Sequence, residues 1–121
     1  MIPACEPDPI PGTEFVMGAT GGVKGQKLER FDLIPAGPLW ELAKLYGVGA
    51  KKYAIRNWER GYPWSLAFSA MMRHAWAWWR GEDDDPETGL SHMTHVAWHA
   101  FALVEFRQRD LGENDRPHAS P

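Results

Sequence analysis

The chain has 121 residues, of which 44% are hydrophobic and 24% are charged, and its formal net charge is −3. This length allows one domain with its own hydrophobic core and excludes two domains of ordinary size. The negative charge argues against a general binder of duplex nucleic acid, because such proteins present a basic face. The single cysteine excludes an internal disulfide and a zinc site built from cysteines, and it favours a reducing compartment.

Both ends of the chain lack the pattern of a folded element. Residues 1–12 contain four prolines and no apolar periodicity, and residues 113–121 are polar and contain proline. We therefore expect flexible segments at 1–17 and 111–121 on either side of a single helical domain at 18–110. The first residues lack the basic start and apolar stretch of a signal peptide, and no run approaches the roughly 20 apolar residues of a membrane helix. A cytoplasmic protein that does not enter membranes is expected.

A glycine-rich segment, GATGGVKGQKLER, occupies residues 18–30. A flexible linker is the default interpretation of such a composition. The alternative is that its backbone amides, together with the basic side chains of Lys27 and Arg30, bind a phosphate. The residue order of a P-loop is absent, so this segment does not predict a P-loop NTPase.

Apolar spacing and end signals predict three helices in the rest of the chain. The first should span residues 38–47, between a proline suited to the first turn and a glycine suited to the end. The second should begin at residue 63 or 65 and end at the glycine at 81. The third should span 91–109 and start at a serine cap.

No segment alternates apolar and polar residues convincingly, so few or no strands are expected. Residues 47–62 have room for a short extra helical turn. The predicted fold is all-α: a compact bundle of three main helices plus short helical turns. Three helices make a thin core for a chain with seven tryptophans, so we expect a homo-oligomer, a dimer or a tetramer, to complete the bundle.

The stretch GEDDDPETGLSHMTH, residues 81–95, contains five carboxylates followed by two histidines. Converging carboxylates at the end of a helix repel one another unless a cation neutralises them. A divalent-ion site is therefore the alternative to a solvated acidic loop. Glu82 and Asp85 form an E-x-x-D pair, which a helical turn aims at one point, although such pairs also arise by chance. Asp83 and Asp84 are expected to face solvent.

Four histidines lie in or near this stretch. His92, His95 and His99 share one face of the third helix, and His74 lies on the apolar face of the second. Hydrogen bonds that brace the helices are the default interpretation. Metal ligation and phosphate binding remain alternatives, because neutral imidazoles are common metal ligands and protonated ones bind anions.

A basic and aromatic group lies between the first two helices. It consists of Lys52, Tyr53, Arg56, Asn57 and Trp58, next to a further lysine. A solvated face is the default interpretation. If these residues line the same cleft as the carboxylates, their cations would bind phosphates and their aromatic rings would stack on a base.

Three segments taken together resemble a known family. In order and spacing, KLERFDLIP, GAKKYAIRNW and RHAWAWWRGEDDDPETGLSHMTH are similar to the phage-associated dATP/dGTP diphosphohydrolase N-terminal domain family. That family is related in character to the MazG-like all-α nucleotide pyrophosphohydrolases. The resemblance covers residues 22–106, which is nearly all of the expected folded part.

The resemblance implies hydrolysis of a purine deoxynucleoside triphosphate with Mg²⁺, or alternatively Mn²⁺, most simply dGTP to dGMP and pyrophosphate. For a phage protein the expected location is the host cytoplasm. MazG-like enzymes hold magnesium with an E-x-x-E pair on one helix and an E-x-x-D pair on the next. Glu82 and Asp85 match the second pair, whereas Glu41 is followed by Lys44 where a carboxylate is expected. Glu41, Glu82 and Asp85 are thus implied as metal ligands, and His74 as a fourth catalytic residue.

Two functions follow as hypotheses. The first is an enzyme whose substrate-binding residues are Lys27, Arg30, Lys52, Tyr53, Arg56, Asn57, Trp58, His92 and His95. The second is a phage protein that binds or sequesters a nucleotide without turnover, which the lysine at position 44 motivates. A purely structural phage protein is a third and more distant alternative.

Overall fold

The computed structural model describes residues 14–118, which form two compact units divided between Pro35 and Ala36. The first unit contains an antiparallel hairpin of β1 (Phe15–Met17) and β2 (Val23–Gly25), followed by a short 3-10 helix, η1 (Phe31–Leu33). The glycine-rich segment supplies the hairpin turn, where the backbone of Gly21 has a φ of +93°.

The chain is mostly helical, but this small sheet corrects the all-α prediction. There is a physical reason why the sequence did not predict these strands. Nearly every residue of β1 and β2 is exposed, so neither strand has a buried face. Without a buried face there is no alternation of apolar and polar residues for the sequence to display.

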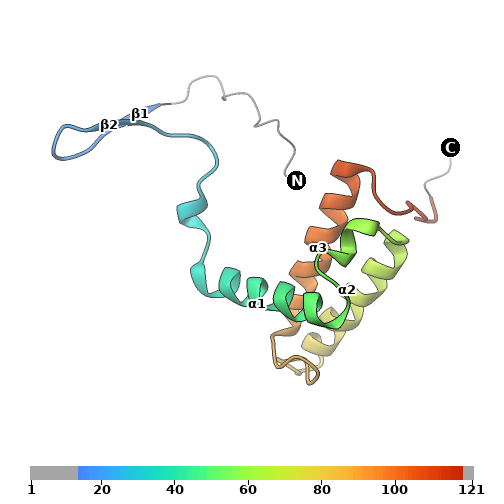
Figure 1. Ribbon diagram of the computed structural model, residues 1–121. Coiled ribbons are helices and arrows are strands. Elements are labelled where there is room, and N and C mark those ends of the chain that lie inside the picture. The colour runs from blue at the N-terminus through green and yellow to red at the C-terminus, as the bar shows by residue number, and fades with distance from the viewer. Residues whose placement is uncertain (1–13, 119–121) are drawn as a thin grey trace. The chain divides into compact units, whose positions relative to one another are not determined.

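The second unit contains the three predicted helices. They are α1 (Ala36–Lys52), α2 (Trp64–Trp79) and α3 (His92–Arg109), and the 3-10 helix η2 (Asn57–Arg60) is the expected extra turn. Figure 1 shows α2 and α3 side by side in opposite directions, and α1 packs mainly against α3. The loop after α2 brings the chain back to the start of α3, at one end of this helical pair.

The observed ends of the helices can be compared with the ends predicted from capping residues, prolines and glycines. Ser91 caps α3 as predicted, because its hydroxyl accepts a hydrogen bond from the amide of Met93 at 3.1 Å. The prediction for α1 was wrong: the helix continues through Gly47 to Lys52. A glycine inside a helix costs only about 1 kcal/mol. Partial burial of the following turn and two lysines near the negative end of the helix dipole offset that cost.

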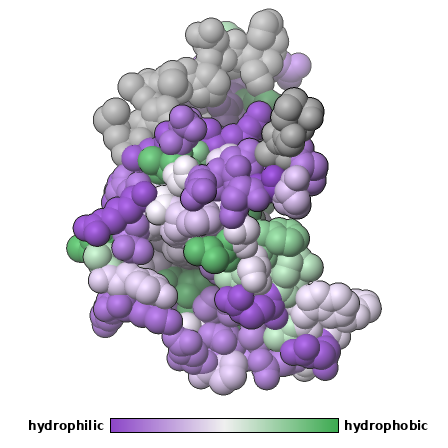
Figure 2. All heavy atoms as spheres, turned by 90° about the vertical axis from the view of Figure 1, so that its right-hand side faces the viewer, coloured by the Kyte–Doolittle hydropathy of each residue, from purple (hydrophilic) through white to green (hydrophobic). Residues whose placement is uncertain are grey.

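The hydrophobic core of this unit is small. The buried apolar side chains come from all three helices and from the loop before α3, and they are Leu42, Leu45, Ala67, Leu90, Ala102 and Phe106. Phe106 is the largest of them and meets the ring of Tyr62 edge-on, with 5.0 Å between centroids. Large apolar side chains such as Trp40 and Trp79 remain exposed. Figure 2 shows hydrophobic patches among hydrophilic residues on the face that it draws.

The segment after α3, which the sequence assigned to a tail, is hydrogen-bonded to the start of α2. The indole of Trp64 donates to the carbonyl of Leu111 at 3.0 Å, and a carboxylate oxygen of Asp115 accepts from the amide of Ser65 at 2.9 Å. Asp115 therefore acts as an N-terminal cap supplied from 50 residues away. Within residues 14–118, none of the helices combines the length and apolar composition that crossing a bilayer requires.

Candidate functional site

The acidic loop between α2 and α3 is closed by its own backbone. The amide of Asp85 donates to the carbonyl of Leu90 at 2.8 Å, and the amide of Gly89 donates to the carbonyl of Asp85 at 2.7 Å. Gly89 has a φ of +72°, a conformation that favours glycine, and the chain turns there. Asp85 becomes half-buried, whereas Asp83 and Asp84 are exposed, as predicted.

A hydrogen-bonded chain joins α2, α3 and the loop. The Nδ1 atoms of His74 and His92 lie 2.8 Å apart, and His92 Nε2 lies 2.7 Å from a carboxylate oxygen of Glu82. For neutral imidazoles a single proton arrangement satisfies both contacts. His92 donates from Nε2 to Glu82 and accepts at Nδ1 the proton of His74. The chain therefore fixes the tautomer of each ring.

A second set of contacts surrounds Asp85. One of its oxygens accepts from the amide and the hydroxyl of Thr88, at 3.2 and 3.1 Å, and lies 3.4 Å from His95 Nε2. The Thr88 hydroxyl is also 2.9 Å from His95 Nε2. The sequence interpretation did not assign Thr88 a role. Its position three residues after an aspartate is typical of a turn in which the carboxylate binds the following backbone, and that spacing was the available signal.

One group of three side chains in the described part of the chain brings potential metal ligands together. One atom each from His74, Asp85 and His92 lies within 4.8 Å of the others. Glu41 and Glu82 are outside this group. Glu41 accepts a hydrogen bond from the Ser91 amide at 2.7 Å, and Glu82 contacts His92. The structure therefore groups Asp85 with two imidazoles, whereas the sequence had grouped it with two glutamates.

Three histidines of this region, His74, His95 and His99, have lowered pKa values that favour the neutral form. Burial, reinforced by the charge of His95, lowers the pKa of His74 to about 4, and burial lowers the pKa of His99 to about 4 as well. The pKa of His95 is also lowered, chiefly by burial. His95 stacks on His74 with 4.1 Å between ring centroids, so neither ring is readily protonated beside the other. At neutral pH these imidazoles offer lone pairs, which is the form that binds metals.

A polar cavity of about 390 Å³ opens beside the potential ligands. His74, Asp85, Thr88 and His95 line one part of it, and Lys52 from the end of α1 lines another. The ammonium group of Lys52 donates to a carboxylate oxygen of the exposed Glu87 at 2.7 Å. A cationic side chain therefore stands at the same cavity as the potential metal ligands.

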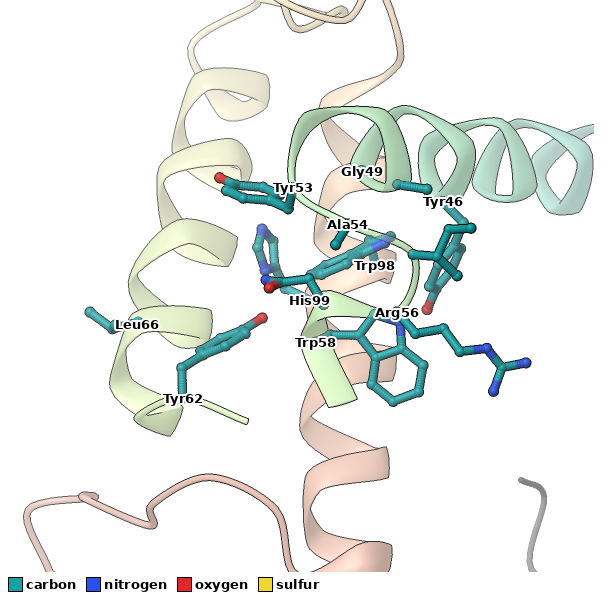
Figure 3. Close-up of a pocket in the computed structure, with 13 residues that line it drawn as sticks. Tyr46, Gly49, Tyr53, Ala54, Arg56, Trp58, Tyr62, Leu66, Trp98 and His99 are labelled. Atoms are coloured by element: carbon teal, nitrogen blue, oxygen red, sulfur yellow. The ribbon is translucent and has the colours of Figure 1, made fainter. Parts of the chain in front are cut away.

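A second, mainly aromatic cavity of about 440 Å³ adjoins the first, and the two share Gly49, Tyr53, Trp98 and His99 in their linings. Figure 3 shows Tyr53, Trp58, Tyr62 and Trp98 around this space. The predicted substrate-binding residues Tyr53, Asn57 and Trp58 all line it. Tyr62 and Trp98 also line it, and the sequence had not assigned them.

Two features of the aromatic cavity concern its polar side chains. The Nδ1 atom of His99 is buried and has no hydrogen-bond partner among residues 14–118. Arg56 contributes to the lining, but Figure 3 shows its guanidinium pointing away from the aromatic rings. The Arg56 side chain is exposed and lies 3.8 Å from Glu59. The charged end of Arg56 is therefore not directed at the aromatic rings of this cavity.

The remaining predicted substrate-binding residues are two basic side chains and two histidines. Lys27 and Arg30 belong to the first unit, where the guanidinium of Arg30 pairs with Asp32 at 2.7 Å. His92 and His95, predicted to bind substrate, are 3% and 9% exposed. Of these two, only His95 lines the polar cavity.

Comparison with known proteins gives two matches. A dATP/dGTP diphosphohydrolase of Salmonella phage PMBT28 is 35% identical over 57 residues, which are 47% of this chain and 19% of that protein. The matched part of the chain thus spans about a fifth of the length of this relative. No solved structure matches. The model of the family described as dATP/dGTP diphosphohydrolase, N-terminal, matches residues 18–116, which include every element of the second unit. The chain therefore belongs to the dATP/dGTP diphosphohydrolase N-terminal family.

Proposed function

We propose that this chain takes part in the hydrolysis of a purine deoxynucleoside triphosphate with a bound divalent cation, with dGTP as the preferred substrate. Water attacks the α-phosphorus, the bond from that phosphorus to the bridging oxygen breaks, and a nucleoside monophosphate and pyrophosphate are released. The activity printed for the phage relative supports this class of reaction. The observation that carries the proposal is the convergence of His74, Asp85 and His92 beside a cavity that also holds Lys52.

In this proposal His74, Asp85 and His92 hold the cation, which would neutralise charge on the phosphates and make a bound water more acidic. Glu82 orients His92 through its hydrogen bond. Glu41, which the resemblance implied as a ligand, braces the start of α3 through the Ser91 amide. Both glutamates then act as positioning residues.

The nucleotide would occupy the two adjoining cavities. Lys52 can bind the phosphates by exchanging its contact with Glu87 for a phosphate oxygen. The aromatic cavity, with Tyr53, Trp58 and Trp98 in its lining, offers stacking surfaces to the base. Its volume of about 440 Å³ lies within the usual range of small-molecule sites. Because the cavities share lining residues, one ligand can reach both.

A screen for pyrophosphate release tests this function. Purified protein is incubated with each deoxynucleoside triphosphate and with Mg²⁺, Mn²⁺ or Zn²⁺ in turn. We expect release from the purine substrates, loss of release in Asp85→Asn, and retention in Asp84→Asn, which removes one charge from the same loop. Wild-type turnover by Asp85→Asn would show that the proposed centre is not catalytic.

Binding of a nucleotide without turnover is a second candidate. Lys44 stands where a fourth carboxylate is expected, and Glu41 and Lys44 line a different cavity from that of Asp85. These positions favour a chain that retains a nucleotide but does not hydrolyse it. Calorimetry with dGTP, combined with product analysis, separates the two: tight binding without product supports retention, and repeated turnover contradicts it.

We also propose that copies of the chain associate and that the protein works in the host cytoplasm. The support for association is the small core together with exposed apolar side chains on the helices, among them Trp40, Trp79, Phe101 and Val104. Light scattering at micromolar concentration should then give a mass above that of one chain.

A further inference from the structure

The ligands of the candidate metal site differ in chemistry from those expected of a magnesium enzyme. Mg²⁺ prefers oxygen ligands and keeps several of its waters. The group described here offers two imidazole nitrogens and one carboxylate oxygen. Imidazole nitrogens favour ions such as Zn²⁺, Co²⁺, Ni²⁺ and Fe²⁺, and two histidines with one carboxylate form a recurrent set for such ions.

The surroundings of His92 match the support that metal-binding histidines usually have. A ligating imidazole commonly donates its other N–H to a carboxylate, which fixes the ring and its tautomer. His92 Nε2 lies 2.7 Å from the Glu82 carboxylate, so its Nδ1 lone pair is directed to the other side of the ring. That is the side on which His74 lies, at 2.8 Å. The His92 side chain is only 4% exposed, which keeps the ring from turning.

We propose that His74, Asp85 and His92 form a site for a transition-metal ion of the Zn²⁺ and Co²⁺ class, with Glu82 as the residue that positions His92. A metal bound at His92 Nδ1 takes the lone pair that now accepts the proton of His74. The hydrogen bond between the two rings therefore breaks on binding. The His74 proton is transferred to the other nitrogen of its ring, so His74 stays neutral and its Nδ1 lone pair becomes free. This inference names the metal of the proposed function, but binding itself does not depend on turnover.

Glu82 serves this site without being a ligand. Its side chain is about half exposed, at 55%, and belongs to the loop rather than to either helix. Removing such a carboxylate typically weakens metal binding about 10- to 100-fold. Asp84, two residues further along, is exposed and outside the group of three. Asp84→Asn is therefore a matched control for Glu82→Gln, because each substitution removes one negative charge from the same loop.

Metal titration of the full chain tests the proposal. The protein is freed of metal with a chelator and titrated with Co²⁺, whose visible absorption reports nitrogen ligation, and with Zn²⁺ and Mg²⁺ by calorimetry. We expect one Co²⁺ or Zn²⁺ per chain, bound at least about 100-fold more tightly than Mg²⁺. Asp85→Asn and His92→Gln should abolish the Co²⁺ spectrum, Glu82→Gln should weaken Zn²⁺ binding about 10- to 100-fold, and Asp84→Asn should leave it unchanged.

Several results would overturn this assignment. Equal affinity for Mg²⁺ and Zn²⁺ would refute the choice of metal, and equal affinities in Glu82→Gln and Asp84→Asn would refute the role of Glu82. Circular dichroism of the metal-free variants establishes that each is folded; if Glu82→Gln is not, Glu82→Asp, with its shorter reach, should give an intermediate loss. Zn²⁺ binding without triphosphate hydrolysis would refute the proposed function alone. If the protein hydrolyses the triphosphate with Mg²⁺ but does not bind Zn²⁺ or Co²⁺, this inference is refuted and the proposed function is not.

Discussion

Glu41, in the second turn of α1, accepts a hydrogen bond at 2.7 Å from the backbone amide of Ser91, the residue that caps α3. The contact joins residues 50 positions apart. It also places a carboxylate at the N-terminus of α3, where the helix dipole favours negative charge. A side chain that resembled a metal ligand in the sequence thus holds two helices together.

Substitution of Glu41 should therefore affect stability rather than metal binding. Glu41→Ala removes both the acceptor and the charge and should lower the free energy of unfolding by about 1–2 kcal/mol. Glu41→Gln keeps a hydrogen-bond acceptor but removes the charge, so its free energy of unfolding should fall by about half as much. Urea denaturation measures both values, and Zn²⁺ calorimetry on the same samples should show unchanged affinity. If Glu41→Gln abolished metal binding while remaining folded, Glu41 would be a ligand after all.

Stability of the metal-free protein should fall as the pH is lowered from 7 to 5. The pKa of His74 and of His99 is about 4 in the folded chain, below the ordinary value of 6.5. The unfolded state therefore binds more protons between these values, so the stability present above pH 6.5 is lost as the pH falls toward 4. The expected loss between pH 7 and pH 5 is about 1–2 kcal/mol per histidine.

Denaturant unfolding at several pH values, with chelator present, measures this loss. His99→Gln keeps a polar side chain that does not titrate, so its free energy of unfolding should depend less steeply on pH than that of the parent. Identical pH dependence in the two proteins would show that His99 does not contribute.

The close crossing of the chain at Gly61 and Gly112 should tolerate no side chain. A Cβ added to Gly112 would lie 2.3 Å from the carbonyl oxygen of Tyr62, and the residue also has a φ of +70°. Gly89 has a similar φ of +72° but nothing within 4 Å of the added atom. Gly89→Ala should therefore cost only the backbone strain, about 1–2 kcal/mol. Gly112→Ala should cost more than about 3 kcal/mol, because the backbone itself must move.

Thermal and urea unfolding of these two variants separate the clash from the strain. If Gly89→Ala and Gly112→Ala lowered the free energy of unfolding equally, the C-terminal segment would be able to move away from Tyr62 without an energetic cost. That result would contradict a firm attachment of this segment to the start of α2.

The aromatic cavity should account for recognition of the base. Trp58→Ala removes a ring from the cavity lining and should weaken binding of a purine nucleotide about tenfold, since stacking on one aromatic ring is worth about 1–3 kcal/mol per base. Trp40, 79% exposed and in the lining of a different cavity, provides the matched control. Calorimetry with dGTP should give a lower affinity for Trp58→Ala than for Trp40→Ala. Equal affinities would place the base elsewhere.

Local patterns predicted much of the helical unit. The serine cap of α3 and the extra helical turn both depend on residues close together in the chain, so the sequence displays them. The cap that Asp115 supplies to Ser65 left no such signal, because its partners are 50 residues apart. The length of α1 was missed since packing after Gly47 outweighs the weak preference of glycine to end helices.

The sequence named several side chains that the structure brings together, but it did not show which of them contact one another. Spacing along one helix suggested that Glu82 and Asp85 point at the same place. In the structure they lie on a loop, where Asp85 contacts Thr88 and His95, and Glu82 contacts His92. The 2.8 Å contact between His74 and His92 links two helices, and which side chains meet across helices is decided by packing that a single sequence does not display.

The continuity of α1 through its glycines has a consequence for how the acidic loop is held. Glu41 contacts the end of the loop at Ser91, and Lys52 contacts the loop at Glu87, so one helix supports the loop at two points. The helical register between these two contacts must be kept. Each residue turns a helix by about 100° and lengthens it by about 1.5 Å, so a single insertion between Glu41 and Lys52 would turn one of them away from its partner. In this stretch of α1, changes of residue type are therefore easier to accommodate than changes of length.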